Sequence, residues 1–225
     1  MDTTADLTAL TIGVLGGTGP QGRGLALRWA QAGLRVVIGS RSAERATEAA
    51  AEINAAAGST SVAGGDNTAC AAESDVVLVA VPWDGHADLL TGLKAELAGK
   101  VVVDCVNPLG FDKQGAFALP VAEGSAAQQA EALLPDSRVT AAFHHVSAVL
   151  LADLSIATLD TDVLVLGDDR DATDLVRALA DAIPGMRGIF GGRLRNAHQV
   201  EALTANLISV NRRYKAHAGL RVTDV

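Results

Sequence analysis

The sequence predicts an α/β protein built on a doubly wound, mostly parallel β-sheet. Short apolar runs alternate with alanine-rich stretches at helical spacing, which is the pattern of repeated strand–helix–strand units. A glycine-rich turn separates the first apolar run from the first helical stretch. The chain also contains 23 glycines and only 3% aromatic residues, which favours an α/β fold over an all-β fold.

Buried parallel strands are expected where apolar runs show no polar alternation, at 11–16, 35–40, 75–81 and 100–106. The spacing predicts helices over 20–32, 43–57 and 84–98. A short third strand at 61–65 and a helical turn at 71–75 complete this half. Units of this kind connect through right-handed crossovers.

The second half has weaker patterns. Residues 107–123 have no clear period and contain Pro and Gly, so we expect a loop. Ser125 and Gln128 have capping-box spacing, and Pro135 ends the following helix. A strand is predicted at 139–146, a strand–turn–helix unit at 162–183, and a long final helix at about 194–217. We expect a Rossmann-type domain at 1–150 and a small C-terminal α/β domain at 151–225.

Bulk properties narrow the function classes. The formal net charge of −8 argues against a nucleic-acid partner. Cys70 and Cys105 form no CxxC pair, so we interpret them as buried thiols in a reducing compartment. The first ten residues do not resemble a secretion signal, and no apolar run has the length of a membrane span. A cytoplasmic protein with no membrane partner is expected.

The turn after the first strand carries the clearest motif. Its glycines make G-x-G-x-x-G between a strand and a helix, the context in which a helix N-terminus binds a pyrophosphate. Pro20 suits the first helical turn but removes one amide donor. The remaining expected donors are the amides of Thr18, Gly19 and Gln21, with the Thr18 hydroxyl as a compensating donor. The glycines are Gly17, which is expected to make the tight turn, Gly19 and Gly22.

The end of the second strand favours NADP over NAD. NAD enzymes usually place Asp or Glu there to bind the ribose 2′-hydroxyl. This chain has Ser40 and Arg41 instead, and Arg45 follows one helical turn later. A guanidinium pairs with a 2′-phosphate and stacks on adenine. The alternative is an arginine-rich helix start that simply faces solvent.

The loops after the later strands should border the nicotinamide. Val81 and Gly85 lie in the loop 81–86, where Trp83 is either a pocket wall or a core residue. His144 and His145 would point to opposite faces of a strand, which disfavours a shared metal. Asp168, Asp169 and Asp171 are interpreted as helix-capping residues. No side chain is assigned a catalytic proton transfer and no metal site is predicted.

Motifs along nearly the whole chain resemble the NADPH-dependent reductases of coenzyme F-420, a deazaflavin, in archaea and actinobacteria. The resemblance runs through GVLGGTGPQGRGLALR, VVIGSRSAERA, VPWDGHADLL, FHHVSA and RNAHQVEALTANLISVNRR. It implies reversible hydride transfer between NADPH and coenzyme F-420, from nicotinamide C4 to deazaflavin C5, with the protein mainly aligning two stacked rings.

The resemblance also implies site residues. The NADP set is Thr18, Gly19, Pro20, Gln21, Ser40, Arg41, Arg45, Val81 and Gly85; the deazaflavin set is His144, Val146, Ala148 and, with less support, Ala218. Arg45 replaces a lysine of the family, and His145 has no family counterpart. The family is dimeric, which suits an apolar stripe on the last helix at Val200, Leu203, Leu207 and Val210.

Two other functions stay open at this point. An NADPH-dependent imine or keto-acid reductase shares the N-terminal motifs, but it normally needs a proton donor and a longer helical C-terminal domain. A non-catalytic NADPH-sensing protein would bind the nucleotide without hydride transfer.

Overall fold

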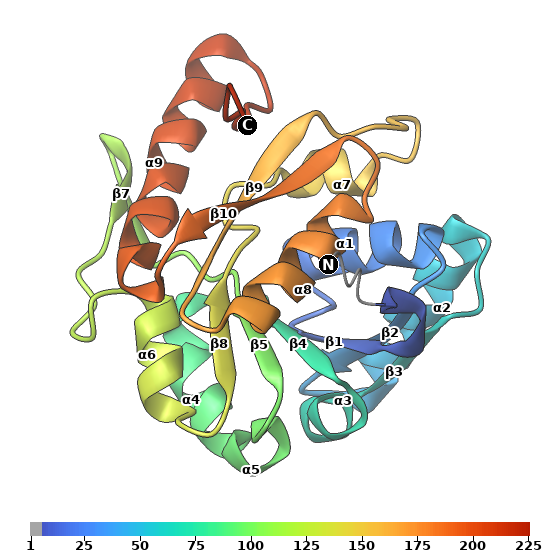
Figure 1. The fold of residues 1–225 in the computed structure, drawn as a ribbon. Coiled ribbons are helices and arrows are strands. Elements are labelled where there is room, and N and C mark those ends of the chain that lie inside the picture. The colour runs from blue at the N-terminus through green and yellow to red at the C-terminus, as the bar shows by residue number, and fades with distance from the viewer. Residues whose placement is uncertain (1–5) are drawn as a thin grey trace.

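The computed structural model describes residues 6–225 and places eight strands in one sheet (Figure 1). The strand order is β10-β9-β8-β5-β4-β1-β2-β3. All neighbours pair in parallel except β8 and β9, which are antiparallel. The strands are β1 (Thr11–Leu15), β2 (Arg35–Ser40), β3 (Val62–Asp66), β4 (Val76–Val79), β5 (Val101–Asp104), β8 (Arg138–Ala141), β9 (Thr161–Gly167) and β10 (Met186–Gly192).

Helices cover both faces of this sheet and bury two separate apolar clusters. The first face carries α1 (Pro20–Gln31), α2 (Ala43–Ala57), α7 (Ala148–Ala152) and α8 (Arg170–Asp181). The second carries α3 (Asn67–Glu73), α4 (His86–Gly92), α5 (Lys94–Leu97), α6 (Ala126–Leu133) and the start of α9 (Ala197–Tyr214). Single 3₁₀ turns lie at η1 (Leu7–Ala9), η2 (Trp83–Gly85) and η3 (Leu194–Asn196).

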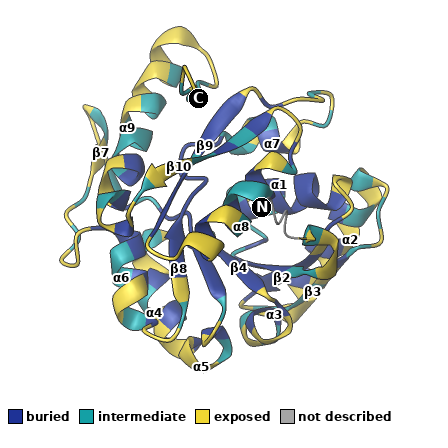
Figure 2. Ribbon diagram, viewed as in Figure 1, coloured by how far each residue is buried: buried dark blue, intermediate teal, exposed yellow. Residues whose placement is uncertain are grey.

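The central strands are buried on both sides, as Figure 2 shows in dark blue. Every residue of β4 and β5 is buried, which explains why their sequences are continuous apolar runs. The architecture confirms the doubly wound, mostly parallel sheet and the long final helix. The order reverses at β1, between β2 and β4, so the carboxyl ends of β1 and β4 border the crevice where such sheets bind ligands.

The prediction of a loop over 107–123 was wrong in part. Strands β6 (Leu109–Asp112) and β7 (Gly115–Ala118) form an antiparallel hairpin that packs against α9. The Asp112 carboxylate accepts hydrogen bonds from the amides of Gln114 (2.7 Å) and Gly115 (3.1 Å). Asp at the first and Gly at the fourth turn position was the available signal, but four-residue strands have too little periodicity to reveal themselves.

Two further boundaries differ from the expectation. The predicted helix over 84–98 is interrupted at Leu93 and divides into α4 and α5. The predicted strand over 139–146 ends at Ala141, because β8 passes into a loop in which Phe143 has a φ of 65°. His144 and His145 therefore lie on a loop, and the alternation argument for their side chains does not apply.

The strands β9 and β10 continue the same sheet beyond residue 150. The division into domains at 1–150 and 151–225 stays a prediction about folding units. In the described part of the chain, no helix combines the length and apolar character required to cross a membrane.

Candidate functional site: the crevice at the carboxyl ends of β1, β2 and β4

The turn after β1 is built on Gly16, not on the first glycine of the motif. Gly16 has a φ of 77°, and a Cβ on it would lie 2.5 Å from the carbonyl oxygen of Ala80. Both facts exclude larger residues. Gly17 instead donates its amide to the carbonyls of Val14 (3.1 Å) and Gly39 (3.2 Å). The tight-turn role expected of Gly17 is therefore corrected to Gly16.

One expected phosphate donor is already engaged. The amide of Gly19 donates to the carbonyl of Gly16 at 2.9 Å, which closes the turn. Gly19 is also the N-cap of α1, and Pro20 occupies its first turn as expected. This leaves the amides of Thr18 and Gln21, with the Thr18 hydroxyl, as the donors still expected to meet an anion at this helix start.

Gln21 ties this loop to the second half of the chain. Its side-chain Nε2 donates to the carbonyl of Phe143 at 3.2 Å. Phe143 precedes the two histidines, and its ring packs edge-on against buried Trp29 of α1 at 5.7 Å. The sequence had assigned Gln21 only a backbone role, so this bridge between α1 and the histidine loop is a feature of the tertiary structure.

A cavity of about 860 Å³ opens over the phosphate loop, a volume within the range of small-molecule sites. It brings together seven of the expected NADP residues from three strand ends. Gly17, Pro20, Gln21 and Gly22 are not among its lining residues. The lining comprises Gly16, Thr18, Gly19, Ser40, Arg41, Ser42, Arg45, Asn67, Ala80, Val81, Pro82, Asp84, Gly85 and Leu89.

Arg41 and Arg45 are held at the edge of this cavity by the start of α2. The Ser42 hydroxyl caps the helix by accepting from the Arg45 amide at 3.3 Å. Both arginine residues are exposed, and within residues 6–225 neither forms an ion pair. Their guanidinium groups are therefore available to an anion in the cavity.

Asn67 is a candidate residue that the sequence analysis missed. It begins α3 and lines the same cavity. Its Oδ1 is buried and has no hydrogen-bond partner among the residues that the structure describes. A buried acceptor without a partner is costly, so a ligand that donates to it would relieve that cost. A lone Asn after a short strand gave no sequence signal.

The loop after β4 covers a buried ion pair. His86 Nε2 lies 2.6 Å from Asp104 Oδ2, and both side chains are fully buried. Burial alone lowers the pKa of His86, but the hydrogen bond and charge of Asp104 outweigh it and raise the pKa overall. Trp83 packs on the His86 ring at 5.4 Å and is partly buried against the core. Trp83 does not line the cavity, which favours the core role over a pocket wall.

The two histidines are both buried but have different partners. Burial lowers the pKa of His144 to about 4, so its imidazole is neutral near pH 7. Its backbone carbonyl accepts from Asn107 Nδ2 (2.9 Å) and Thr204 Oγ1 (3.1 Å). His145 donates from Nε2 to the carbonyl of Asp162 at 2.7 Å. The unassigned second histidine thus links this loop to β9.

A second, narrow cavity of about 30 Å³ lies between this loop and the C-terminal tail. It brings together Val146 and Ala218 from the expected deazaflavin set, with His145 beside them. Ala148 begins α7 close by, and neither Ala148 nor His144 lines this cavity. Of the expected deazaflavin residues, the structure therefore brings only Val146 and Ala218 together at this cavity.

The capping residues of the later helices behave mainly as expected. Asp169 accepts from the Ala172 amide at 2.8 Å and caps α8, while Asp168 pairs with Arg193 at 2.9 Å.

The start of α6 is bound by two side chains. Ser125 caps this helix by accepting from the Gln128 amide at 3.0 Å. The Glu201 carboxylate of α9 binds the same helix start by accepting the Ala126 and Ala127 amides at 2.9 and 3.1 Å. Burial raises the pKa of Glu201 to about 7.

Comparison with known proteins identifies the family of this chain. Residues 11–108 match the family described as "NADP oxidoreductase coenzyme F420-dependent". The "F420-dependent NADP reductase" of Methanothermobacter thermautotrophicus is 40% identical over 223 residues, covering 96% of both chains. The chain belongs to the F420-dependent NADP reductase family.

Other members of this family agree over the full length. The enzyme of the same name from Methanocaldococcus jannaschii is 38% identical, covering 96% of this chain and 99% of its own. A crystal structure from Arthrobacter sp. FB24, provisionally described as an F420-dependent NADP reductase, superposes with a TM-score of 0.80 at 26% identity. It covers 95% of this chain and 99% of its own. The expected resemblance is thereby confirmed.

Proposed function

We propose that this chain catalyses reversible hydride transfer between NADPH and oxidised coenzyme F-420, yielding NADP⁺ and the reduced deazaflavin. The observation that carries this function is 40% identity over nearly the full length of both chains to a protein named for that activity. The two coenzymes supply the hydride donor and acceptor. The task of the protein is to bind, orient and shield them.

The 860 Å³ cavity is the proposed NADP site. Its residues fit the nucleotide: Thr18 lies before a helix N-terminus suited to the pyrophosphate, and Arg41 and Arg45 suit the 2′-phosphate. Gln21 lies in the first turn of that helix, outside the cavity lining, and its amide is a further proposed donor. Ser40 adds a hydroxyl donor where a carboxylate would repel that phosphate. We also propose Asn67 as a further nucleotide contact, because its buried Oδ1 accepts no hydrogen bond from the described residues.

The deazaflavin is proposed to lie beside the loop 143–147, near Val146, Ala148 and Ala218. Gln21 connects this loop to the phosphate loop by its bond to Phe143, so the two coenzyme sites share one support. His144 is proposed to hold the loop through its carbonyl bonds to Asn107 and Thr204. Its neutral imidazole does not add a charge beside the transferring hydride. No side chain is assigned a proton transfer.

A homodimer is the proposed assembly, with the later turns of α9 as its contact. Val200 is buried within the chain, whereas Leu203 and Leu207 are half-buried and Val210 is 36% exposed. Phe111 and Phe117 of the neighbouring hairpin are 69% and 44% exposed. Exposed apolar side chains on a helix and on the hairpin packed against it are typical of a subunit contact.

We also propose a cytoplasmic location and only small-molecule redox partners. Cys70 and Cys105 are both buried and free, as expected in a reducing compartment. The acidic balance of the chain argues against a nucleic-acid partner.

The experiment that tests the activity mixes the purified protein with NADPH and oxidised coenzyme F-420. The visible absorbance of the oxidised deazaflavin should disappear at a rate proportional to enzyme concentration. Tight NADPH binding without this loss would refute the proposed activity and favour an NADPH-sensing protein. Consumption of NADPH with imines or keto acids, but not with the deazaflavin, would favour the other reductase class.

A further inference from the structure

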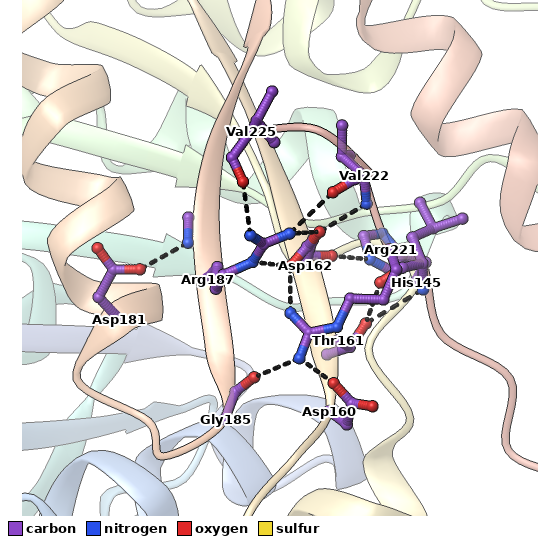
Figure 3. Close-up of polar contacts among 12 residues, drawn as sticks. His145, Asp160, Thr161, Asp162, Asp181, Gly185, Arg187, Arg221, Val222 and Val225 are labelled. Carbon is purple, nitrogen blue, oxygen red and sulfur yellow. Dashed lines mark hydrogen bonds and ion pairs between the residues drawn. The ribbon is translucent and has the colours of Figure 1, made fainter.

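Asp162 is a fully buried carboxylate surrounded by donors from distant segments (Figure 3). Arg187 of β10 donates to both of its oxygens, from Nε to Oδ1 and from Nη2 to Oδ2, each at 2.7 Å. Arg221 Nη1 donates to Oδ1 at 2.6 Å, and the amide of Val222 donates to Oδ2 at 2.6 Å. Two of these four bonds come from the last five residues of the chain.

The remaining bonds of this cluster also hold the C-terminal tail. Arg187 donates from Nη2 to the carbonyl of Val222 and from Nη1 to the carbonyl of Val225, each at 2.9 Å. The amide of Asp162 donates to the carbonyl of Leu220 at 2.8 Å. Figure 3 shows the tail lying along β9 with Asp162 between Arg187 and Arg221. Asp162 therefore fixes the tail through its backbone as well as its side chain.

The backbone of the same residue fixes the opposite wall of the narrow cavity. His145 donates to the Asp162 carbonyl at 2.7 Å, which holds His145 and Val146 in place. The facing wall is formed by His217, Ala218 and Gly219, immediately before the segment bound to the Asp162 carboxylate. The cavity of about 30 Å³ between them has room for only a few water molecules. A small displacement of the tail therefore changes the width of this cavity by a large fraction.

A buried carboxylate costs free energy unless its partners are well placed. Here every group that donates to the Asp162 carboxylate belongs either to the tail or to Arg187, which also binds the tail. The buried charge therefore serves mainly to hold the tail in position. The lowered pKa of Asp162, caused first by the hydrogen bond from Arg187, keeps the carboxylate charged at neutral pH.

We propose that Asp162 is a positioning residue for the deazaflavin site: it sets the distance between the His145–Ser147 loop and the His217–Gly219 wall. This inference rests on the proposed placement of the deazaflavin beside that loop. Without the carboxylate the wall keeps the bonds of the Leu220 carbonyl to Asp162 and of the Ala218 amide to Asn211 but loses the anchor of the segment that follows it. The wall is then held less firmly, and the deazaflavin must order it further on binding. The cost appears in the deazaflavin KM and not in NADPH binding, because the NADP cavity is lined by other elements.

The test compares Asp162→Asn with wild type and with Arg170→Ala. Arg170 is an exposed arginine on α8 that pairs with Asp174 at 3.7 Å and lines neither of the two cavities. For Asp162→Asn we expect the KM for coenzyme F-420 to rise about tenfold, with the NADPH Kd unchanged within about twofold. Hydrogen exchange at the Val222 amide should accelerate. Arg170→Ala should change none of these quantities.

A second variant guards against misfolding of Asp162→Asn. A chain ending at Leu220 removes Arg221 and the Val222 amide but leaves Asp162 and Arg187 intact, and we expect the same selective rise in KM. An unchanged KM for coenzyme F-420 in either folded variant would overturn the inference. So would an equal loss of affinity for both coenzymes. Absence of deazaflavin reduction by the wild type refutes the proposed function instead.

Discussion

At the scale of single residues, we propose that the choice of NADP over NAD depends on Ser40, Arg41 and Arg45. Ser40 ends β2, Arg41 follows it directly and Arg45 lies in the first turn of α2, so the backbone brings all three to the edge of the same cavity. Spacing along the sequence was enough to predict this grouping, because a strand end and the next helix start are neighbours in any βαβ unit. Asn67 follows a different strand, and only the fold brings it there.

Replacing Arg41 and Arg45 by alanine tests this selection. The double variant should bind NADPH at least about tenfold more weakly, because each lost charge-assisted hydrogen bond to the 2′-phosphate contributes about 1.5–3 kcal/mol. NADH, which lacks that phosphate, should lose much less. Calorimetric titration of each variant with both nucleotides measures the difference, with Arg170→Ala as the exposed-arginine control. An equal loss for NADPH and NADH would contradict the assignment.

At the scale of elements, α9 has two functions along its length. Its first turns are buried, where Val200 packs in the core and Glu201 caps α6. The helix also packs against β7, as Figure 1 shows, and its later turns keep apolar side chains partly exposed. The helix was predictable from its apolar period. The capping of a second helix by Glu201 was not, because its partners lie about 75 residues away in sequence.

The exposed face of α9 leads to a prediction about assembly. Leu207→Asp should convert the proposed dimer to a monomer, because the new carboxylate would lose its hydration in an apolar contact. Light scattering coupled to gel filtration measures the mass. Asn206→Asp adds the same charge at an exposed neighbouring position and should leave the mass unchanged. A wild-type mass equal to one chain would refute the dimer.

At the scale of the whole molecule, stability should depend on pH through buried His144. Burial lowers its pKa to about 4, whereas an unfolded histidine titrates near about 6.5. The unfolded chain therefore binds more protons between these values. The stability that neutral His144 contributes is complete above about pH 6.5 and is lost as the pH falls toward 4.

Urea unfolding of wild type and His144→Gln at pH 7.5 and pH 5 measures this effect. The wild type should lose more unfolding free energy between the two pH values than the variant, which has no titrating imidazole there. His145, His86 and Glu201 are present in both proteins, so their titration cancels in the comparison. Equal pH dependence in the two proteins would show that His144 is not held neutral by burial.

The sequence by itself determined the sheet, its central strands, the phosphate turn and the arginines that follow β2. These features depend on interactions over short stretches, where apolar runs, glycine spacing and helix starts act locally. The hydrophobic pattern did not predict the β6–β7 hairpin, because its strands are too short. It also missed the start of the histidine loop, because the apolar run in the sequence continues past the end of β8.

Only the tertiary structure decided which distant residues meet. Gly16 takes the turn with a positive φ because Ala80 approaches it from the loop after β4. Gln21 reaches Phe143, and Asp162 binds His145 through its carbonyl and Arg187 and the C-terminal tail through its buried carboxylate. These contacts join segments separated by between 17 and 122 residues. Their partners are set by the packing of the whole sheet, and no local period in the sequence records such packing.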